Sequence, residues 1–255
     1  MQEGIQRVRI ALILSLLTVQ LLIAESDAFA DDFESEFEAE FAESAEVNGF
    51  DPLRGYNRMM TSFNDMLYMN VYFPVARGYE AVIPEEGRLA VGRVYDNLRF
   101  PVRFANNLLQ LKFQNSAEEL SRFVVNSTLG IGGMFDPAST WLGLEAHPED
   151  LGQTLGHYGV GSGFHIVLPF LGPSNLRDTL SLAPDWYIDP VVYWNGRGDN
   201  LFHTYAEAIG SQGLYFVNRG SFEYKLYESI RKDAVDLYPF LKNAYEQSRE
   251  KAIEE

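Results

Sequence analysis

The stretch LGQTLGHYGVGSGFHIVLPFLGPSNL, residues 151–176, contains no Asp, Glu, Lys or Arg, although these residues make up 22% of the chain. Its length would suit a transmembrane helix, which needs about 20 apolar residues. Five of its first thirteen residues are glycine and two prolines follow, so a stable helix is not expected. Residues 164–168 have strand character. We therefore predict a glycine-rich loop or hairpin in an apolar setting.

Two interpretations of this stretch remain open. At membrane depth, backbone N–H and C=O groups outside regular structure are tolerated only where protein or a water-filled cavity provides hydrogen-bond partners. In this interpretation the stretch would line a cavity. The alternative is an ordinary buried loop. An aromatic cluster around Asp189-Pro190 suits a lipid–water boundary, although core packing or a protein interface explains it equally well. Its members are Trp186, Tyr187, Tyr193 and Trp194.

The remainder of the folded region is predicted to be mainly α-helical. Prolines, capping residues and apolar periodicity set the expected boundaries. The expected helices cover residues 51–72 (Asp51 as N-cap, Pro52 at the first helical position), 74–82, a third from 84 that Pro101 interrupts, 117–129 after a Ser116–Glu119 capping box, 173–182, and most of 200–253 with a break at Pro239.

The first 48 residues are predicted to lie outside the folded domain. In residues 1–30, two arginines precede an apolar run and a small-x-small site, Ala28-Phe29-Ala30, which indicates a signal peptide; an uncleaved anchor is the alternative. Residues 31–48 carry eight acids and no base. They are interpreted as a disordered acidic leader or as a docking segment that folds on a partner. Residues 49–255 would form a single helical domain.

Composition excludes several functions. The formal net charge is -16, which makes nucleic-acid binding improbable. There is no cysteine, so disulfides, thiolate chemistry and a cysteine-linked lipid anchor are excluded. The four histidines show no i, i+4 metal-binding pair, and no phosphate-binding glycine motif occurs, so neither a metal nor a cofactor is expected.

Catalysis is the weaker interpretation of the remaining polar residues. The nucleophile elbow G-x-S-x-G is absent, and only a Ser162–His157–Asp178 triad is conceivable for an acyl hydrolase. We therefore expect no catalytic residues. An exported, mainly helical binding or transport protein at a membrane is favoured over an enzyme.

Two long blocks show a family resemblance. They are RFVVNSTLGIGGMFDPA, residues 122–138, and DLGQTLGHYGVGSGFHIVLPFLGPSNLRD, residues 150–178. Shorter matches precede them: Asp51-Pro52 to Asn57-Arg58, Phe63-Asn64-Asp65, Arg99 to Pro101, and Asn106 to Gln110. With these motifs the chain resembles the MlaA (VacJ) family of bacterial outer-membrane proteins over roughly residues 50–250.

The resemblance implies a fold and a function. It implies a ring-like bundle of amphipathic helices around a polar channel, with a short glycine-rich β-hairpin or loop. It further implies non-enzymatic phospholipid transport at the periplasmic face of the outer membrane. Mislocalised phospholipid would leave the outer leaflet and pass to a soluble periplasmic carrier, which maintains lipid asymmetry, and a porin would be a partner. A periplasmic lipid hydrolase and a structural porin-associated protein are the alternatives.

The resemblance also supplies candidate site residues. Polar positions inside the matched motifs are candidates for the lipid path, and bracing of helices is their alternative role; they are Asn64, Asp65, Arg122, Asn126 and Asp136. Residues 152–168 form the candidate gate, because glycines permit backbone movement. Its candidate residues are Gly156, Gly159, Gly161, Gly163 and His165.

Two departures from the family stand out. The chain lacks the N-terminal acylated cysteine, so anchoring must come from apolar helix faces, a porin-like partner or an uncleaved signal. His165 stands where an aromatic such as Tyr is expected; as a channel residue it would make passage sensitive to mild acid, and as a packing residue it would not.

Overall fold

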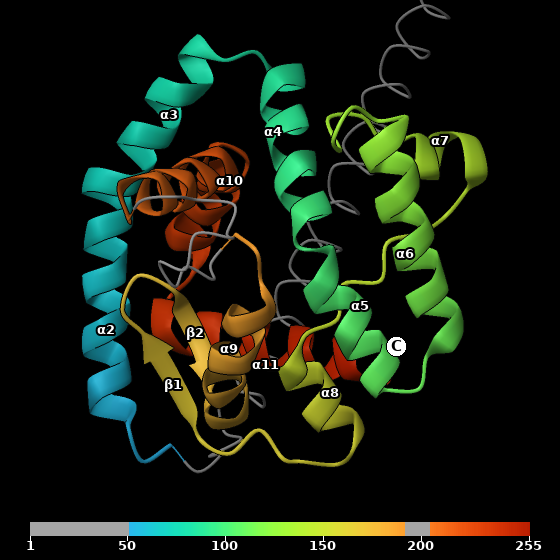
Figure 1. The fold of residues 1–255 in the computed structure, drawn as a ribbon. Coiled ribbons are helices and arrows are strands. Elements are labelled where there is room, and N and C mark those ends of the chain that lie inside the picture. The colour runs from blue at the N-terminus through green and yellow to red at the C-terminus, as the bar shows by residue number, and fades with distance from the viewer. Residues whose placement is uncertain (1–50, 192–204) are drawn as a thin grey trace, which may run out of the picture. The chain divides into compact units, whose positions relative to one another are not determined.

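A computed structural model describes residues 51–191 and 205–255; the predicted signal peptide and acidic leader, Tyr193 and Trp194 lie outside these ranges. The described part is mainly α-helical with one two-stranded sheet, as predicted (Figure 1). Its elements are α2 Arg54–Leu67, the π-helix η1 Tyr68–Tyr72, α3 Phe73–Val82, α4 Glu85–Leu98, α5 Phe100–Leu109, α6 Phe113–Thr128, α7 Pro137–Leu142, α8 Leu151–His157, β1 His165–Leu168, β2 Gly172–Asn175, α9 Leu176–Ile188, α10 Tyr205–Asp233 and α11 Leu237–Glu254.

The helix starts predicted at Pro74 and Pro84 and the interruption predicted at Pro101 are confirmed. Pro74 and Pro101 occupy the first turns of α3 and α5, where the missing N–H has no helical partner to lose. Pro84 is the N-cap of α4, and Glu85 and Glu86 lie in its first turn beside the positive end of the helix dipole. These boundaries depend only on local backbone chemistry.

Two predicted N-caps are wrong. The N-cap of α2 is Leu53, because the Asp51 carboxylate instead accepts a 2.5 Å hydrogen bond from the Tyr238 hydroxyl. The predicted end before Pro74 is replaced by η1, which carries α2 directly into α3. Ser116 lies inside α6 and donates its hydroxyl to the Lys112 carbonyl, so it forms no capping box.

Two further predictions need correction. Pro173 lies in β2, and α9 begins at Leu176 with Asn175 as its N-cap, because the Asn175 side chain accepts from the Asp178 amide. The break in the C-terminal helices falls before Asp236, the N-cap of α11, and Pro239 lies in the first turn of that helix. Proline is accepted there for the same reason as in α3.

The predicted hairpin exists but lies later in the chain. Strand character at 164–168 is confirmed by β1, which pairs antiparallel with β2 from His165↔Asn175 to Leu168↔Gly172. Two asparagines of α2, seven residues apart, cover the other edge of β1. Asn57 bonds the His165 carbonyl and the Val167 amide, and Asn64 bonds the Leu168 carbonyl and the Phe170 amide. These side chains protect an otherwise free strand edge.

The glycine-rich segment before the hairpin forms a short helix, contrary to prediction. α8 is stabilised at its start by Asp150, which accepts from the Gln153 amide at 2.8 Å. It packs against α9 and α11, α5 packs against α6, and α10 lies between α3 and α4 (Figure 1). Tertiary packing thus outweighs the low helix propensity of glycine.

The described part has an inverted distribution of polarity. Its largest fully buried side chains are polar or charged: Glu119, Asn57, Asn106, Asn107, Asn175 and Asp189. Large apolar side chains are instead widely exposed, with Val82 at 77% and Trp141 at 70%. No described helix combines the length and apolar character that crossing a membrane requires. Buried polar groups of this kind are stable only when hydrogen-bonded, and networks of hydrogen bonds fill this interior.

Candidate functional site: a cavity with charged walls

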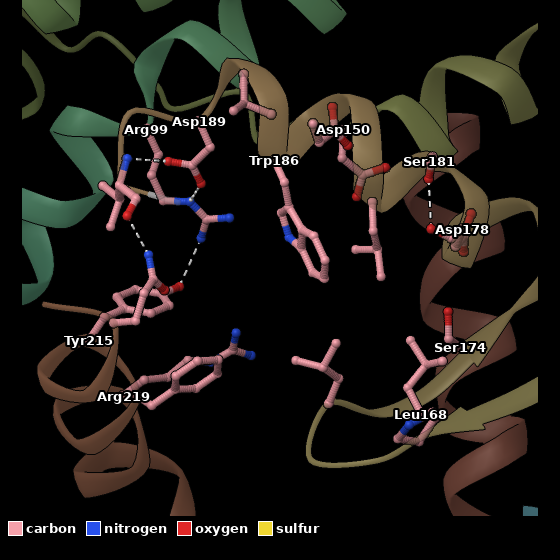
Figure 2. A pocket seen from close by; sticks show the side chains of 18 of the residues that line it. Arg99, Asp150, Leu168, Ser174, Asp178, Ser181, Trp186, Asp189, Tyr215 and Arg219 are labelled. Carbon is pink, nitrogen blue, oxygen red and sulfur yellow. Dashed lines mark hydrogen bonds and ion pairs between the residues drawn. The ribbon is translucent and has the colours of Figure 1, made fainter. Parts of the chain in front are cut away.

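A cavity of about 580 Å³ lies between α9 and α10 (Figure 2). Its lining residues on α9 recur every three or four positions and therefore share one helix face. They are Asp178, Ser181, Leu182, Asp185 and Trp186, and Asp189 follows at the helix end. A second stripe with the same spacing comes from α10: Gln212, Tyr215, Phe216 and Arg219. The hairpin, α11, Val102 of α5 and Asp150, the N-cap of α8, complete the wall.

One wall carries two guanidinium groups. Arg99, between α4 and α5, donates from Nε to Asp189 at 2.8 Å and from Nη1 to the Tyr215 hydroxyl at 2.9 Å. Asp189 is 1% exposed, so this pair fixes the end of α9 against α10. Arg219 of α10 points into the cavity, and its Nε donates to Glu223 at 2.6 Å (Figure 2).

The opposite wall holds a network centred on Arg249 of α11. Its Nη1 and Nη2 donate to the two carboxylate oxygens of Asp150 at 2.7 and 2.8 Å, and its Nε donates to Asp178 at 2.9 Å. Arg177 and the Tyr245 hydroxyl also donate to Asp178, at 2.9 and 2.7 Å. Burial alone would raise the pKa of Asp178, but these donors outweigh it and hold the pKa below its usual value.

Two glycines of α8 make room for this network. A Cβ at Gly152 would lie 2.4 Å from an Asp178 carboxylate oxygen and 2.7 Å from Arg249 Nη2. A Cβ at Gly156 would lie 2.5 Å from the Ile253 side chain and 2.9 Å from Arg177 Nη1. The spacing Gly-x-x-x-Gly therefore lets α8 approach α9 and α11 closely. At both positions any larger residue would clash with a neighbouring side chain, so close packing alone explains why glycine is present.

The predicted lipid-path residues lie away from this cavity. Asn64 braces the hairpin, and Asp65 accepts from Arg231 and Tyr227 of α10. Arg122, Asn126 and Asp136 form a separate cluster at a hollow of about 270 Å³, where Asp136 caps α7 and accepts from both partners. The structure thus gives each of them hydrogen bonds to backbone or neighbouring side chains.

The predicted gate residues do not act as one element. Gly156 and Gly159 line a second hollow of about 410 Å³, which shares Arg249 with the main cavity. Gly161 has open space around it. Gly163 has a positive φ of 73°, and a Cβ there would lie 2.9 Å from the Leu176 side chain. His165 is 3% exposed, lies outside the lining of the main cavity and contacts Glu246 at 2.9 Å, which favours its interpretation as a packing residue.

The conceivable hydrolase triad is not assembled. The Asp178 carboxylate is engaged by the arginines, Tyr245 and Asn175, and the Ser162 hydroxyl donates to the Gly163 carbonyl. The His157 ring packs edge-on against Tyr158. No group of three or more metal-ligating side chains occurs within residues 51–191 and 205–255.

Sequence reasoning missed the residues that line the cavity. Arg99 lies inside a matched motif but was not singled out, and Asp185, Trp186, Arg219 and Arg249 were assigned no role in the site. A usable signal was present, because acids repeat along 178–189 at helical spacing. The partner stripe on α10 is separated by a long connection, so only the fold brings the two together.

Fold and site together define a mainly α-helical protein built around a charged cavity, with many of its large apolar side chains on the outside. Comparison with known proteins places it more narrowly. The chain belongs to the MlaA lipoprotein family, whose model matches residues 49–252.

Similar proteins include named and solved members. The chain is 31% identical over 206 residues to an uncharacterized protein of Rickettsia prowazekii, covering 80% of this chain and 78% of that one. It is 35% identical over 147 residues to the intermembrane phospholipid transport system lipoprotein MlaA of Escherichia coli, covering 56% and 58%. A solved structure, from work on the structural basis for maintenance of bacterial outer membrane lipid asymmetry, matches 80% of this chain and 100% of its own with a TM-score of 0.67 and 27% identity.

Proposed function

We propose that this chain carries phospholipid from the outer leaflet of the outer membrane through the cavity between α9 and α10 to a soluble periplasmic carrier. The names of its relatives support transport, and the observation that carries the proposal for this chain is the charged cavity inside a fold with an apolar exterior. A phospholipid headgroup is costly to bring into hydrocarbon without polar partners, and such a cavity supplies them. The role is non-enzymatic, because moving a lipid breaks no covalent bond.

Exposed apolar side chains provide a means of anchoring at the periplasmic face of the outer membrane without an acylated cysteine. Residues 129–142, which include the connection from α6 to α7, carry exposed large apolar side chains at six positions: Leu129, Ile131, Met134, Phe135, Trp141 and Leu142. Exposed apolar side chains gathered in one short segment are typical of a membrane or protein interface. We propose that it contacts acyl chains and that a porin partner contributes the remaining affinity.

A single-cysteine experiment tests the transport path. The native chain has no cysteine, so Leu182→Cys places one reactive thiol in the cavity wall, and Leu180→Cys places one on the same helix at a position that is 67% exposed and outside the lining. Each variant complements a deletion strain, and a bulky, reductant-cleavable thiol reagent is added. We expect modification at 182, but not at 180, to raise outer-leaflet phospholipid and detergent sensitivity, with reversal by reductant.

Other outcomes separate the rival functions. Unchanged lipid distribution after modification at 182 would contradict passage through this cavity. A structural porin-associated protein would co-purify with a porin, and modification of the thiol at 182 would leave lipid distribution unchanged. A hydrolase would release fatty acid or headgroup from phospholipid when purified, and would lose that activity on Ser162→Ala or His157→Ala.

A further inference from the structure

The cavity contains one carboxylate without a cationic partner. Asp178 pairs with Arg177 and Arg249, and Asp189 pairs with Arg99. Asp185 receives only neutral donors, the Leu151 amide at 2.9 Å and the Asn106 side chain at 3.0 Å. Among the residues that the structure describes, no Lys, Arg or His lies within ion-pair distance of it.

The unpaired charge is unfavourable for folding. Burial raises the pKa of Asp185, and the nearby Asp150 carboxylate adds to the rise. The hydrogen bonds from Leu151 and Asn106 and the more distant charge of Arg99 offset this only in part. A raised pKa in an acid means that the folded state disfavours the ionised form, so the charge lowers stability at neutral pH. A carboxylate has about four acceptor positions, and only two are used here. Asp185 can therefore accept a cation at the cavity surface.

An aromatic ring lies next to this carboxylate in the chain. Trp186 is 41% exposed, and its indole reaches from α9 into the cavity (Figure 2). The face of an indole attracts ammonium groups, more strongly than other aromatic rings do. A carboxylate and an indole on one helix face together form a combination suited to an organic ammonium ion.

The opposite wall offers the complementary charge. The side chain of Arg219 is 57% exposed, and its guanidinium points into the cavity, where Nε donates to Glu223 and the Tyr215 hydroxyl is a further partner. A guanidinium has five N–H donors and matches phosphate oxygens well. The cavity thus presents the carboxylate of Asp185 and the indole of Trp186 from α9 and the guanidinium of Arg219 from α10.

We propose that Asp185 and Trp186 bind the ammonium group of a zwitterionic phospholipid headgroup while Arg219 binds its phosphate. The inference rests on the proposed transport function and adds a preference for amine-bearing over anionic headgroups. A uniformly basic cavity would favour anionic lipids, whereas the unpaired Asp185 repels them.

Calorimetric titration of the purified full-length protein tests this preference. The probes are two water-soluble short-chain lipids with identical acyl chains, a phosphatidylethanolamine and a phosphatidylglycerol. We expect the native protein to bind the ethanolamine lipid more tightly. Asp185→Asn should weaken that binding about tenfold, as expected for loss of a charged hydrogen bond, and leave phosphatidylglycerol binding unchanged or tighter. Trp186→Leu should weaken ethanolamine binding by a factor of about three.

Controls separate binding from folding. Asp185→Asn removes the charge but leaves one acceptor oxygen for the Leu151 amide and the Asn106 side chain, so the thermal midpoint of each variant is measured and affinities are compared only between folded proteins. Asp185→Glu retains the charge and should restore part of the preference. Glu86→Gln removes an exposed charge on α4, outside the cavity lining, and should change neither affinity.

The remaining outcomes overturn the inference in distinguishable ways. If the native protein binds both lipids equally, or if Asp185→Asn weakens both equally, the headgroup preference is refuted while transport through the cavity stands. If the native protein binds neither lipid, the inference fails and the proposed transport path fails with it.

Discussion

The substitution Gly152→Ala tests whether α8 glycines are packing positions. The added Cβ would lie 2.4 Å from the Asp178 carboxylate, against an ordinary contact of 3.4 Å or more, and 2.7 Å from Arg249. Neither group can retreat freely, because Asp178 and Arg249 hold hydrogen bonds of 2.7 to 2.9 Å to four other residues. The clash must therefore move α8 or break the network.

The expected change in the free energy of unfolding on Gly152→Ala is the balance of destabilising and stabilising effects. Breaking a buried ion pair costs about 3–5 kcal/mol, and overpacking alone costs about 1–3 kcal/mol. The Asp150 side chain is 39% exposed, so its share of the network is screened and small. Replacing a helical glycine by alanine returns up to about 1 kcal/mol. The free energy of unfolding should fall by about 2–3 kcal/mol.

Denaturant unfolding of the detergent-solubilised protein measures this change, and Gly161→Ala is the matched control. Gly161 belongs to the same uncharged stretch, has open space around it and has no positive φ, so alanine there should be neutral or slightly stabilising. If Gly152→Ala raises stability by about 1 kcal/mol, as an unconstrained helical glycine would, the close approach of α8 to Asp178 and Arg249 is refuted.

Substitutions at three further positions extend these predictions. Arg99→Leu leaves Asp189, at 1% exposure, without its cation, and should lower the free energy of unfolding by about 3 kcal/mol, whereas Arg99→Lys should lower it less; equal losses in denaturant titrations would count against the ion pair. The pKa of Asp178 is lower in the folded protein than the value of about 4 expected in the unfolded chain. The ionised carboxylate therefore stabilises the fold at pH values above about 4, and this contribution is lost as the pH falls. The thermal midpoint of Asp178→Asn should consequently depend less on pH between about 5 and 2 than that of the native protein. Gly78→Ala, in α3 with open space around it, should raise the thermal midpoint, with a gain of up to about 1 kcal/mol.

Sequence patterns predicted the helix starts that depend on local backbone chemistry. Prolines 74 and 101 fix the backbone angle φ of the first helical turn wherever the rest of the chain lies. Helix N-caps were less predictable, because a capping side chain can accept a hydrogen bond either from the nearby backbone amide or from a donor far away in the sequence. Asp51 illustrates this, since the Tyr238 hydroxyl, 187 positions away, takes its carboxylate.

The candidate site was harder to predict for a related reason. A polar residue in a family motif signals that its side chain matters, but not what it contacts. Asn64 hydrogen-bonds backbone groups of the hairpin and Asn126 accepts from a backbone amide of α7, contacts that the motif alone did not reveal. The cavity instead depends on helix faces from distant segments, and no local pattern encodes that α9 lies opposite α10 across it.

The absence of charge between 151 and 176 has a structural explanation in what borders it. Asp150 lies immediately before the stretch and Arg177-Asp178 immediately after it, and Arg249 binds both carboxylates. The guanidinium of Arg249 in α11 therefore links the two ends of the segment. The segment itself has no charged side chains, and it packs through close contacts at its glycines and through hydrogen bonds with the Asn57 side chain. Asp178 is the first of the α9 residues that line the cavity, so its contact with Arg249 also positions that cavity wall. The uncharged stretch thus serves the site by holding its ends, and any substitution that displaces Arg249 should disturb α8 packing and the cavity together.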